Sequence, residues 1–123
     1  MPGLGEIGAK YYLLGEAPGR TEDEQNMPFV GAAGKKLDRL LELAKIDPNE
    51  IYLANVCRCR PPENRTPKKK EIAACKGFVF RELRLVKPSF LITLGSTPLS
   101  LFSPYGVTQV HGTSFIWEMP DEP

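Results

Sequence analysis

The sequence has little of several features that often identify a protein's class. It contains one histidine, one tryptophan and three cysteines, and its formal net charge is +1 over 123 residues. It has no apolar run near the roughly 20 residues of a membrane span, and its first residues lack the basic-then-apolar pattern of a secretion signal. We therefore expect a single soluble, cytoplasmic domain over residues 1–123 that acts as a monomer.

The charge balance and the cysteine count narrow the possible partners and the possible roles of the thiols. Lys and Arg number 16 and Asp and Glu number 15, so the total charge does not favour nucleic acid and only local clustering can do so. An odd number of cysteines, with Cys57 and Cys59 separated by one residue, suits reduced thiols or metal ligands better than a disulfide framework.

Two stretches have the spacing of amphipathic helices. In residues 32–44 leucines recur at helical period, and charged residues, Lys36 among them, fall on the opposite face. A longer stretch, residues 68–86, follows Thr66 and Pro67, which we expect to be its N-cap and its first-turn proline. A third, short helix is expected after Gly95-Ser96.

Apolar runs at residues 11–14, 51–56 and 90–94 predict strands that alternate with these helices. This order predicts an α/β fold, a three-layer sandwich with a central, mostly parallel sheet of about four strands flanked by helices. We expect residues 15–30 to form a long loop without secondary structure, and residues 108–117 to form a hairpin or an edge strand.

Three short blocks follow the first two strands and stand where sites on open α/β sheets commonly lie. They are Gly15-Glu16-Ala17-Pro18-Gly19, Met27-Pro28-Phe29-Val30-Gly31-Ala32-Ala33-Gly34, and Ala54-Asn55-Val56-Cys57-Arg58-Cys59-Arg60-Pro61-Pro62-Glu63-Asn64-Arg65. Together they resemble the family 4 uracil-DNA glycosylases, which usually carry an iron-sulfur cluster. The resemblance runs from about residue 12 to about residue 112 and implies a hydrolase that excises uracil flipped out of DNA, in base excision repair.

The resemblance assigns the first block to the sugar and phosphate of the flipped nucleotide, because small residues let backbone N–H groups approach a ligand. Gly15, Pro18 and Gly19 would bind substrate, and Glu16 would line the approach as a catalytic residue. Ala17 occupies the place where family 1 enzymes have a water-activating aspartate, so no strong general base is expected there.

The same resemblance gives roles to three further residues, each with a plainer alternative. Phe29 would stack on the flipped base, or it is an aromatic that fills the edge of the core. Asn55 would pair with N3–H and O4 of uracil, or it forms a local Asx-turn. Glu22 would lie beside the ring edge and exclude bulkier bases, or it is a solvated loop acid.

A locally basic segment follows the second strand. Arg58, Arg60, Arg65 and Lys68, followed by Lys69 and Lys70, are opposed only by Glu63. We expect contacts to the DNA backbone, because cations at a helix N-terminus oppose the helix dipole and do not stabilise it. The alternative is a solvated helix start.

Cys59 and Cys75 match the second ligand pair of the family's cluster, and Cys57 offers at most a third thiol. A [4Fe–4S] cluster normally takes four thiolates, so we expect an incomplete or absent cluster in this chain. Either the chain is shortened or this member has lost the cluster, and Cys57 and Cys75 can equally be small buried hydrophobes.

The family's leaving-group histidine, in a His-Pro motif, has no matching residue in this sequence, and we do not transfer its role to His111. We therefore expect this chain to hydrolyse uracil from DNA slowly, if it does so at all. The alternatives are a non-catalytic relative that binds nucleic acid or a nucleobase, and an α/β domain for another nucleotide.

Overall fold

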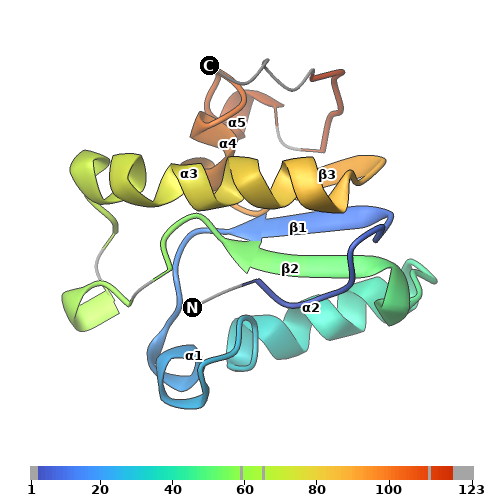
Figure 1. Ribbon diagram of the computed structural model, residues 1–123, viewed down its shortest axis with the longest axis horizontal. Coiled ribbons are helices and arrows are strands. Elements are labelled where there is room, and N and C mark those ends of the chain that lie inside the picture. Colours follow the sequence, from blue (N-terminus) through green and yellow to red (C-terminus); the bar gives the residue numbers. More distant parts are fainter. Residues whose placement is uncertain (1–2, 59, 65, 111, 118–123) are drawn as a thin grey trace.

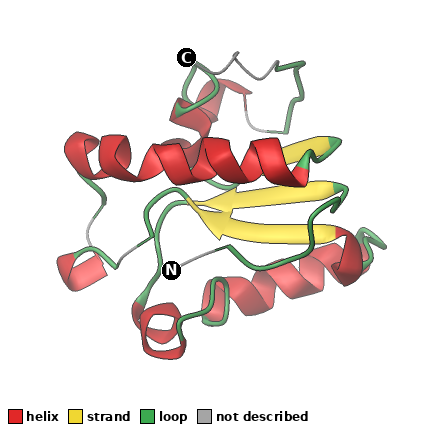
Figure 2. Cartoon of the chain, in the orientation of Figure 1, coloured by secondary structure: helices red, strands yellow, loops and turns green. Residues whose placement is uncertain are grey.

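The computed structural model describes residues 3–58, 60–64, 66–110 and 112–117. Helices and strands alternate along the chain (Figure 2). The elements are β1 (Tyr11–Gly15), α1 (Arg20–Gln25), α2 (Ala32–Leu43), β2 (Ile51–Asn55), α3 (Lys69–Val86), β3 (Phe90–Thr93), α4 (Ser96–Ser100) and α5 (Val107–Val110), with two 3-10 turns at Pro48–Glu50 and Pro62–Asn64.

The strands form one parallel sheet in the order β2-β1-β3, with β1 in the centre. The predicted α/β fold with a parallel sheet is thus confirmed, but the described residues form three strands where about four were expected. The register places Gly15 opposite Asn55. Two more backbone hydrogen bonds extend the pairing beyond these residues, from Val56 N–H to Gly15 O at 2.9 Å and from Cys57 N–H to Glu16 O at 3.0 Å.

Helices cover both faces of the sheet. Figure 1 shows α3 lying across one face and α2 along the other, which gives the expected three layers. Alternate strand residues point to the same face, and the main core lies on the α3 side. Its buried members are Tyr12, Leu14, Ala54, Val56, Cys57, Val79 and Leu83.

Helix α3 is the longest element, and its ends are well defined. Lys68 is the N-cap, and its backbone N–H donates to the Glu71 carboxylate at 2.8 Å. The prediction of Thr66 as N-cap was therefore wrong by two residues. The helix ends at Lys87, which takes a left-handed conformation with φ of 51° ahead of Pro88. Among the described residues, no helix combines the length and the apolar character that crossing a bilayer requires.

Three sequence-based expectations differ from the structure. Residues 15–30 are not without structure, because α1 forms there with Gly19 as its N-cap. Residues 107–110 form the short helix α5, and no strand pairing occurs among the described residues of the expected hairpin. Strand β3 lies at an edge of the sheet, and Phe90 is 53% exposed, so this strand is less buried than its apolar sequence suggests.

Candidate functional site

A cavity of about 390 Å³ opens at the carboxyl ends of β1 and β2. This edge is where ligands bind in open parallel sheets, and the volume lies in the range of about 300 to 1,000 Å³ typical of small-molecule sites. The cavity is lined by Gly15, Glu16, Ala17, Glu22, Phe29, Gly34, Lys36, Leu37, Leu40, Asn55 and Leu94. The structure thus brings together candidate residues from all three sequence blocks.

Gly15 is the point at which Phe29 and Asn55 meet. A Cβ atom built on Gly15 would lie 2.6 Å from Asn55 Oδ1 and 2.6 Å from Phe29 Cζ. These approaches are closer than any real Cβ contact, so only glycine allows the ring and the amide to converge over the end of β1.

Asn55 combines burial with an unused amide. The residue is 7% exposed, and no hydrogen bond joins its side chain to another residue in the described part of the chain. A buried amide without a partner is costly, whereas one that faces a cavity can bind a polar ligand. This geometry does not fit the Asx-turn alternative.

Phe29 is held in an unusual backbone conformation. Its φ is +56°, in the left-handed region that bulky side chains rarely adopt, at a cost of about 1 to 3 kcal/mol. Gly34 permits this turn, because a Cβ built there would overlap the backbone of Phe29. Strain of this kind persists where the surroundings fix it, often at binding sites.

Glu22 joins two turns of the site. One carboxylate oxygen accepts from Gly19 N–H at 3.0 Å, and the other accepts from Gly31 N–H at 2.6 Å. Gly19 and Gly31 are the N-caps of α1 and α2, so a single side chain fixes the start of both helices. This arrangement does not favour a solvated loop acid, and it gives Glu22 a structural task in addition to any contact with a base.

Glu16 is fixed through both its backbone and its side chain. Its carbonyl accepts from Cys57 N–H at 3.0 Å, and its Oε2 accepts from the Thr97 hydroxyl at 2.6 Å. Thr97 belongs to α4 and is 7% exposed. The sequence pattern did not identify Thr97 because this contact joins residues 81 positions apart.

Some predicted site residues do not line the cavity, and some residues that line it were not predicted. Pro18 is buried and Gly19 caps α1, and neither of these two substrate-binding candidates lines the cavity. Five lining residues were not predicted as site residues: Gly34, Lys36, Leu37, Leu40 and Leu94. Lys36 is exposed, as expected for the charged face of its helix, and it also lines the cavity together with Leu37 and Leu40 of α2.

Arg58 does not have the surface position that a contact to the DNA backbone requires. It is 8% exposed, and its guanidinium donates to both oxygens of Glu82, from Nη2 at 2.6 Å and from Nη1 at 3.1 Å. The hydroxyl groups of Tyr12 and Tyr52 donate to the same carboxylate, at 2.8 and 2.9 Å. A count of charges in the sequence could not reveal this buried pair, and we assign Arg58 a structural role.

The contacts between Arg58, Glu82 and Tyr52 shift the pKa values of all three side chains. Burial by itself would lower the pKa of Arg58, but the hydrogen bonds and charge of Glu82 outweigh burial and raise that pKa. Burial would likewise raise the pKa of Glu82, yet the donors around it, Arg58 first, lower that pKa. Burial and then the hydrogen bond to Glu82 raise the pKa of Tyr52 to about 12.

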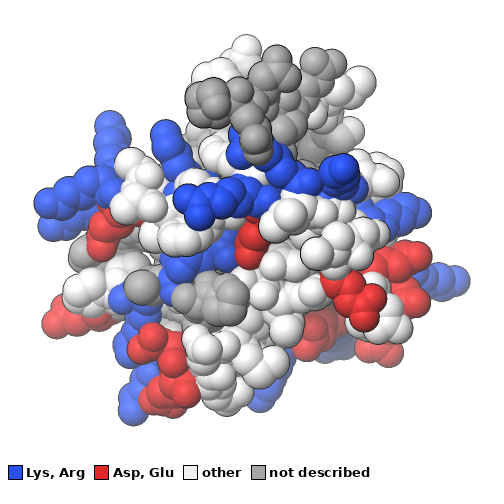
Figure 3. Space-filling model, viewed as in Figure 1, with Lys and Arg blue, Asp and Glu red and all other residues white. Residues whose placement is uncertain are grey.

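The rest of the basic segment lies nearer the surface. Arg60 is half-buried and Lys68 is exposed, and Arg65 lies outside the described residues. On the face drawn in Figure 3, Lys and Arg side chains gather over α3. The exposed basic residues of this helix are Lys69, Lys70, Lys76 and Arg81, whereas its Glu82 points inward to Arg58.

The cysteines within the described residues do not form a four-thiolate site. Cys57 is buried and Cys75 is half-buried, and no group of three or more His, Cys, Asp or Glu side chains in the described residues could hold a metal ion. Burial and then the neighbouring Cys75 raise the pKa of the Cys57 thiol to about 12. Cys59, the other predicted ligand, lies outside the described residues. The described residues therefore do not fit a [4Fe–4S] cluster.

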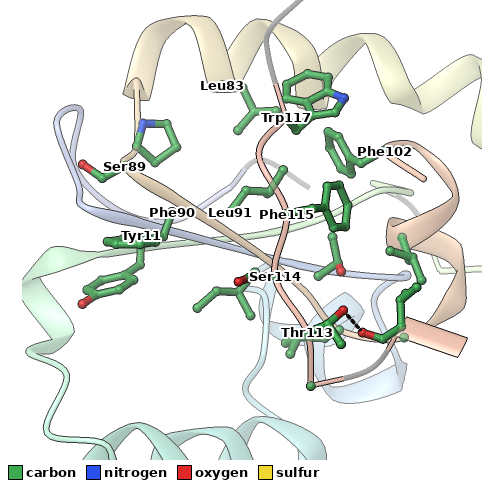
Figure 4. Close-up of a pocket in the computed structure, with 18 of the residues that line it drawn as sticks. Tyr11, Leu83, Ser89, Phe90, Leu91, Phe102, Thr113, Ser114, Phe115 and Trp117 are labelled. Atoms are coloured by element: carbon green, nitrogen blue, oxygen red, sulfur yellow. Dashed lines mark hydrogen bonds between the residues drawn. The ribbon is translucent and has the colours of Figure 1, made fainter. Parts of the chain in front are cut away.

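A larger cavity of about 1080 Å³ lies along β3 and shares the lining residue Leu94 with the smaller cavity (Figure 4). Its lining is mainly aliphatic and aromatic, and Phe102 and Trp117 meet there edge to face with ring centroids 4.8 Å apart. None of the candidate catalytic or base-binding residues lines it. The candidate residues that line a cavity thus line the smaller one.

Comparison with known proteins gives consistent matches. The family described as "Uracil DNA glycosylase superfamily" matches residues 2–121. The chain is 36% identical to the Type-4 uracil-DNA glycosylase of Sulfurisphaera tokodaii, an alignment that covers 99% of this chain and 59% of that protein. It is 38% identical to the Type-4 uracil-DNA glycosylase of Thermotoga maritima, over 94% of this chain and 62% of that protein.

A third relative, the Type-4 uracil-DNA glycosylase of Archaeoglobus fulgidus, is 41% identical over 77% of this chain and 48% of that protein. The chain therefore spans between 48% and 62% of the length of these three relatives.

Proposed function

Because the chain belongs to the uracil-DNA glycosylase superfamily, we propose that its smaller cavity receives a uracil flipped out of DNA and that the protein hydrolyses the N-glycosidic bond of that nucleotide. The observation that carries the proposal is the convergence of the Phe29 ring and the Asn55 amide over Gly15. One supplies an aromatic face and the other an unused donor and acceptor, which are the two groups that a flipped base needs.

The Phe29 ring replaces stacking that the base loses when it leaves the strand. Stacking of a base on an aromatic side chain contributes about 1 to 3 kcal/mol and tolerates any base. Phe29 therefore contributes affinity rather than selectivity. Its left-handed backbone, held by the turn ahead of α2, keeps the ring in place before the base arrives.

The Asn55 amide supplies selectivity. Its oxygen accepts from N3–H of uracil, and its NH₂ group donates to O4. Cytosine has an acceptor at N3 and a donor at the neighbouring exocyclic position, so the same amide would meet cytosine with its donor and acceptor reversed. Because Asn55 is 7% exposed, a mismatched base would leave buried polar groups unpaired.

Binding of two single strands, identical except for one uracil or one cytosine, tests the assignment. Asn55→Asp should reduce the preference for uracil by about 1 to 3 kcal/mol, because a carboxylate cannot donate to O4. Phe29→Ala should weaken binding of both strands. Asn49→Asp is a matched control, since Asn49 is exposed and does not line the cavity.

Cleavage is measured separately, in single-turnover reactions with the uracil strand. Release of free uracil by the unmodified chain, reduced in the Asn55 variant and unchanged in the Asn49 variant, would support the proposed hydrolase. A uracil preference that survives both Asn55→Asp and Phe29→Ala would refute the assigned base pocket. Uracil binding with no release at any enzyme concentration would instead favour the non-catalytic alternative.

A further inference from the structure

The hydroxyl of Thr97 reaches into the candidate site from a distant part of the chain. It donates to Glu16 Oε2 at 2.6 Å, which is within the range of about 2.5 to 2.7 Å for hydrogen bonds from a hydroxyl to an ionised carboxylate. Glu16 lines the smaller cavity and follows Gly15, at the end of the central strand. Thr97 does not line the cavity itself, so it can act on a bound nucleotide only through Glu16.

We propose that Thr97 is a positioning residue: it holds the Glu16 carboxylate at the cavity wall so that its negative charge faces the sugar of the flipped nucleotide. The proposal rests on the proposed function and deepens it, because it assigns the part of the site that stabilises the sugar. Phe29 and Asn55 are left to recognise the base.

Thr97 can hold a carboxylate in place because it is itself buried and anchored by its neighbours. Thr97, Pro98 and Leu99 are all buried, and the loop before α4 is tied to the central strand by Leu94 N–H, which donates to Leu14 O at 2.8 Å. Ser100 Oγ donates to the Thr97 carbonyl at 2.6 Å. A donor that is fixed before the substrate arrives needs no reorganisation during the reaction.

Glu16 needs such a donor because its side chain is long and only half-buried. Its backbone is anchored by the bond from Cys57 N–H, but a glutamate side chain retains several rotamers when nothing binds its carboxylate. Thr97 engages Oε2 of a residue that lines the cavity. The hydroxyl thereby selects one orientation of the charge.

A fixed negative charge suits the chemistry of the bond to be broken. When the bond between C1′ and N1 breaks, both electrons leave with N1 of uracil, and positive charge develops on the sugar. The oxygen of a water molecule then bonds to C1′, and one proton of that water is the proton that uracil finally carries. A carboxylate directed at the sugar stabilises the charge that exists only in the transition state.

Binding of two abasic analogues measures this stabilisation without requiring turnover. One single strand carries a cationic pyrrolidine in place of the sugar, and the other carries a neutral tetrahydrofuran. The unmodified chain should bind the cationic strand more tightly, and Thr97→Val should reduce that preference about tenfold, as expected for a lost hydrogen bond to a charged group. Thr97→Ser keeps the hydroxyl and should retain the preference.

Thr93→Val is the matched control, because it makes the same replacement at a half-buried position of β3 that does not line the smaller cavity. A preference that is equal in the unmodified chain and in Thr97→Val overturns the proposal. Loss of the preference in Thr97→Ser as well would assign the effect to packing and would also overturn it. If Thr97→Val does not fold, Glu16→Gln replaces it, and a cationic preference retained in that variant refutes the role of the charge.

The proposed function is tested by a different comparison, that of the uracil strand with the cytosine strand. Absence of any uracil preference in the unmodified chain contradicts the base pocket, whatever the two abasic analogues show. A uracil preference that depends on Asn55, combined with no effect of Thr97→Val on the cationic preference, would leave the base pocket intact and remove only the role of Thr97.

Discussion

Replacement of Glu82 by glutamine should destabilise the protein more than any other single change of charge in its described interior. The Glu82 carboxylate accepts hydrogen bonds from Arg58, Tyr12, Tyr52 and the backbone N–H of Gly3. Glutamine keeps the shape of this side chain but removes the charge and turns one acceptor into an NH₂ donor. The N–H and O–H groups that now donate to Glu82 would then face the NH₂ group of glutamine, which is also a donor, at a buried site.

The magnitude follows from the burial of the pair. Arg58 is 8% exposed and Glu82 is 17% exposed, so the guanidinium would stay in the protein without its counter-charge. Breaking one side of a buried pair typically costs about 3 to 5 kcal/mol. Total stabilities are about 5 to 15 kcal/mol, so Glu82→Gln should remove a large fraction of the free energy of unfolding. The melting temperature should fall by about 10 to 20 °C.

Urea denaturation followed by circular dichroism gives the free energy of unfolding for the variant and for a matched control. Glu24→Gln is the control, because the Arg20–Glu24 pair has a similar length of 2.9 Å but side chains that are 75% and 61% exposed. Such a surface pair contributes about 0.3 to 0.5 kcal/mol. If Glu82→Gln cost no more than Glu24→Gln, the pair would not be stabilising the fold, and our reasoning about its burial would be refuted.

The same cluster predicts a dependence of stability on pH. The pKa of Glu82 is lowered on folding, so its contribution is present above its ordinary pKa and is lost as the pH falls below about 4.5 toward the lowered value. The pKa of Tyr52 is raised to about 12, so its contribution is present below its ordinary pKa of 10.0 and is lost as the pH rises from there. In Glu82→Gln, denaturation curves should lose much of their acid dependence, whereas an unchanged acid dependence would assign it to other carboxylates.

Three further changes test the candidate site. Gly15→Ala should weaken binding of a uracil strand while costing about 1 to 3 kcal/mol of stability, because the added methyl group displaces Phe29 and Asn55; unchanged affinity would contradict their convergence. Glu22→Gln should loosen the starts of two helices, which hydrogen exchange at their first N–H groups would detect, and unchanged protection would argue against that link. Neutralising residues 68–70 should reduce the slope of log affinity against log salt by about 0.7 per lost contact to a single strand, and an identical slope would make these lysines a solvated surface.

The elements predicted correctly are those with a strong apolar period. β1, β2 and α3 carry runs or stripes that few other structures can bury, and their bounds in the structure differ from expectation by one or two residues. Helix α1 was missed because all six of its residues are polar and none is buried. Its start is set by Gly19 and Glu22, a local signal that could have indicated a helix N-terminus.

The prediction of a hairpin at residues 108–117 was wrong because it relied on a pattern that is too short. Alternation in residues 108–110 is too short to distinguish a strand from one helical turn, and the turn is favoured locally by Gln109, whose side chain accepts from Gly106 N–H at 2.9 Å. Such ambiguity is usual for short segments, because periodicity needs several residues to become apparent.

The candidate site was predictable in part because parallel pairing fixes which strand ends meet. Once β1 and β2 are parallel neighbours, their carboxyl ends meet at the same edge of the sheet, and the observed register places Gly15 opposite Asn55. The burial of Arg58 and the contact from Thr97 depend on tertiary partners, Glu82 and Glu16, far away in the sequence. A single sequence carries no signal for such pairs.

The way the site is held explains why small residues surround it. Gly15 lets the ring and the amide converge, Gly34 lets the chain pass behind Phe29, and a Cβ on Gly31 would lie 2.8 Å from Glu22 Oε2. Each glycine weakens the fold slightly, since it has more freedom to lose on folding. That cost is offset by hydrogen bonds from fixed groups, of which the Glu22 carboxylate is the clearest, because it restrains both flanking turns at once. The strained Phe29 is therefore kept rigid by its surroundings rather than by its own conformational preference.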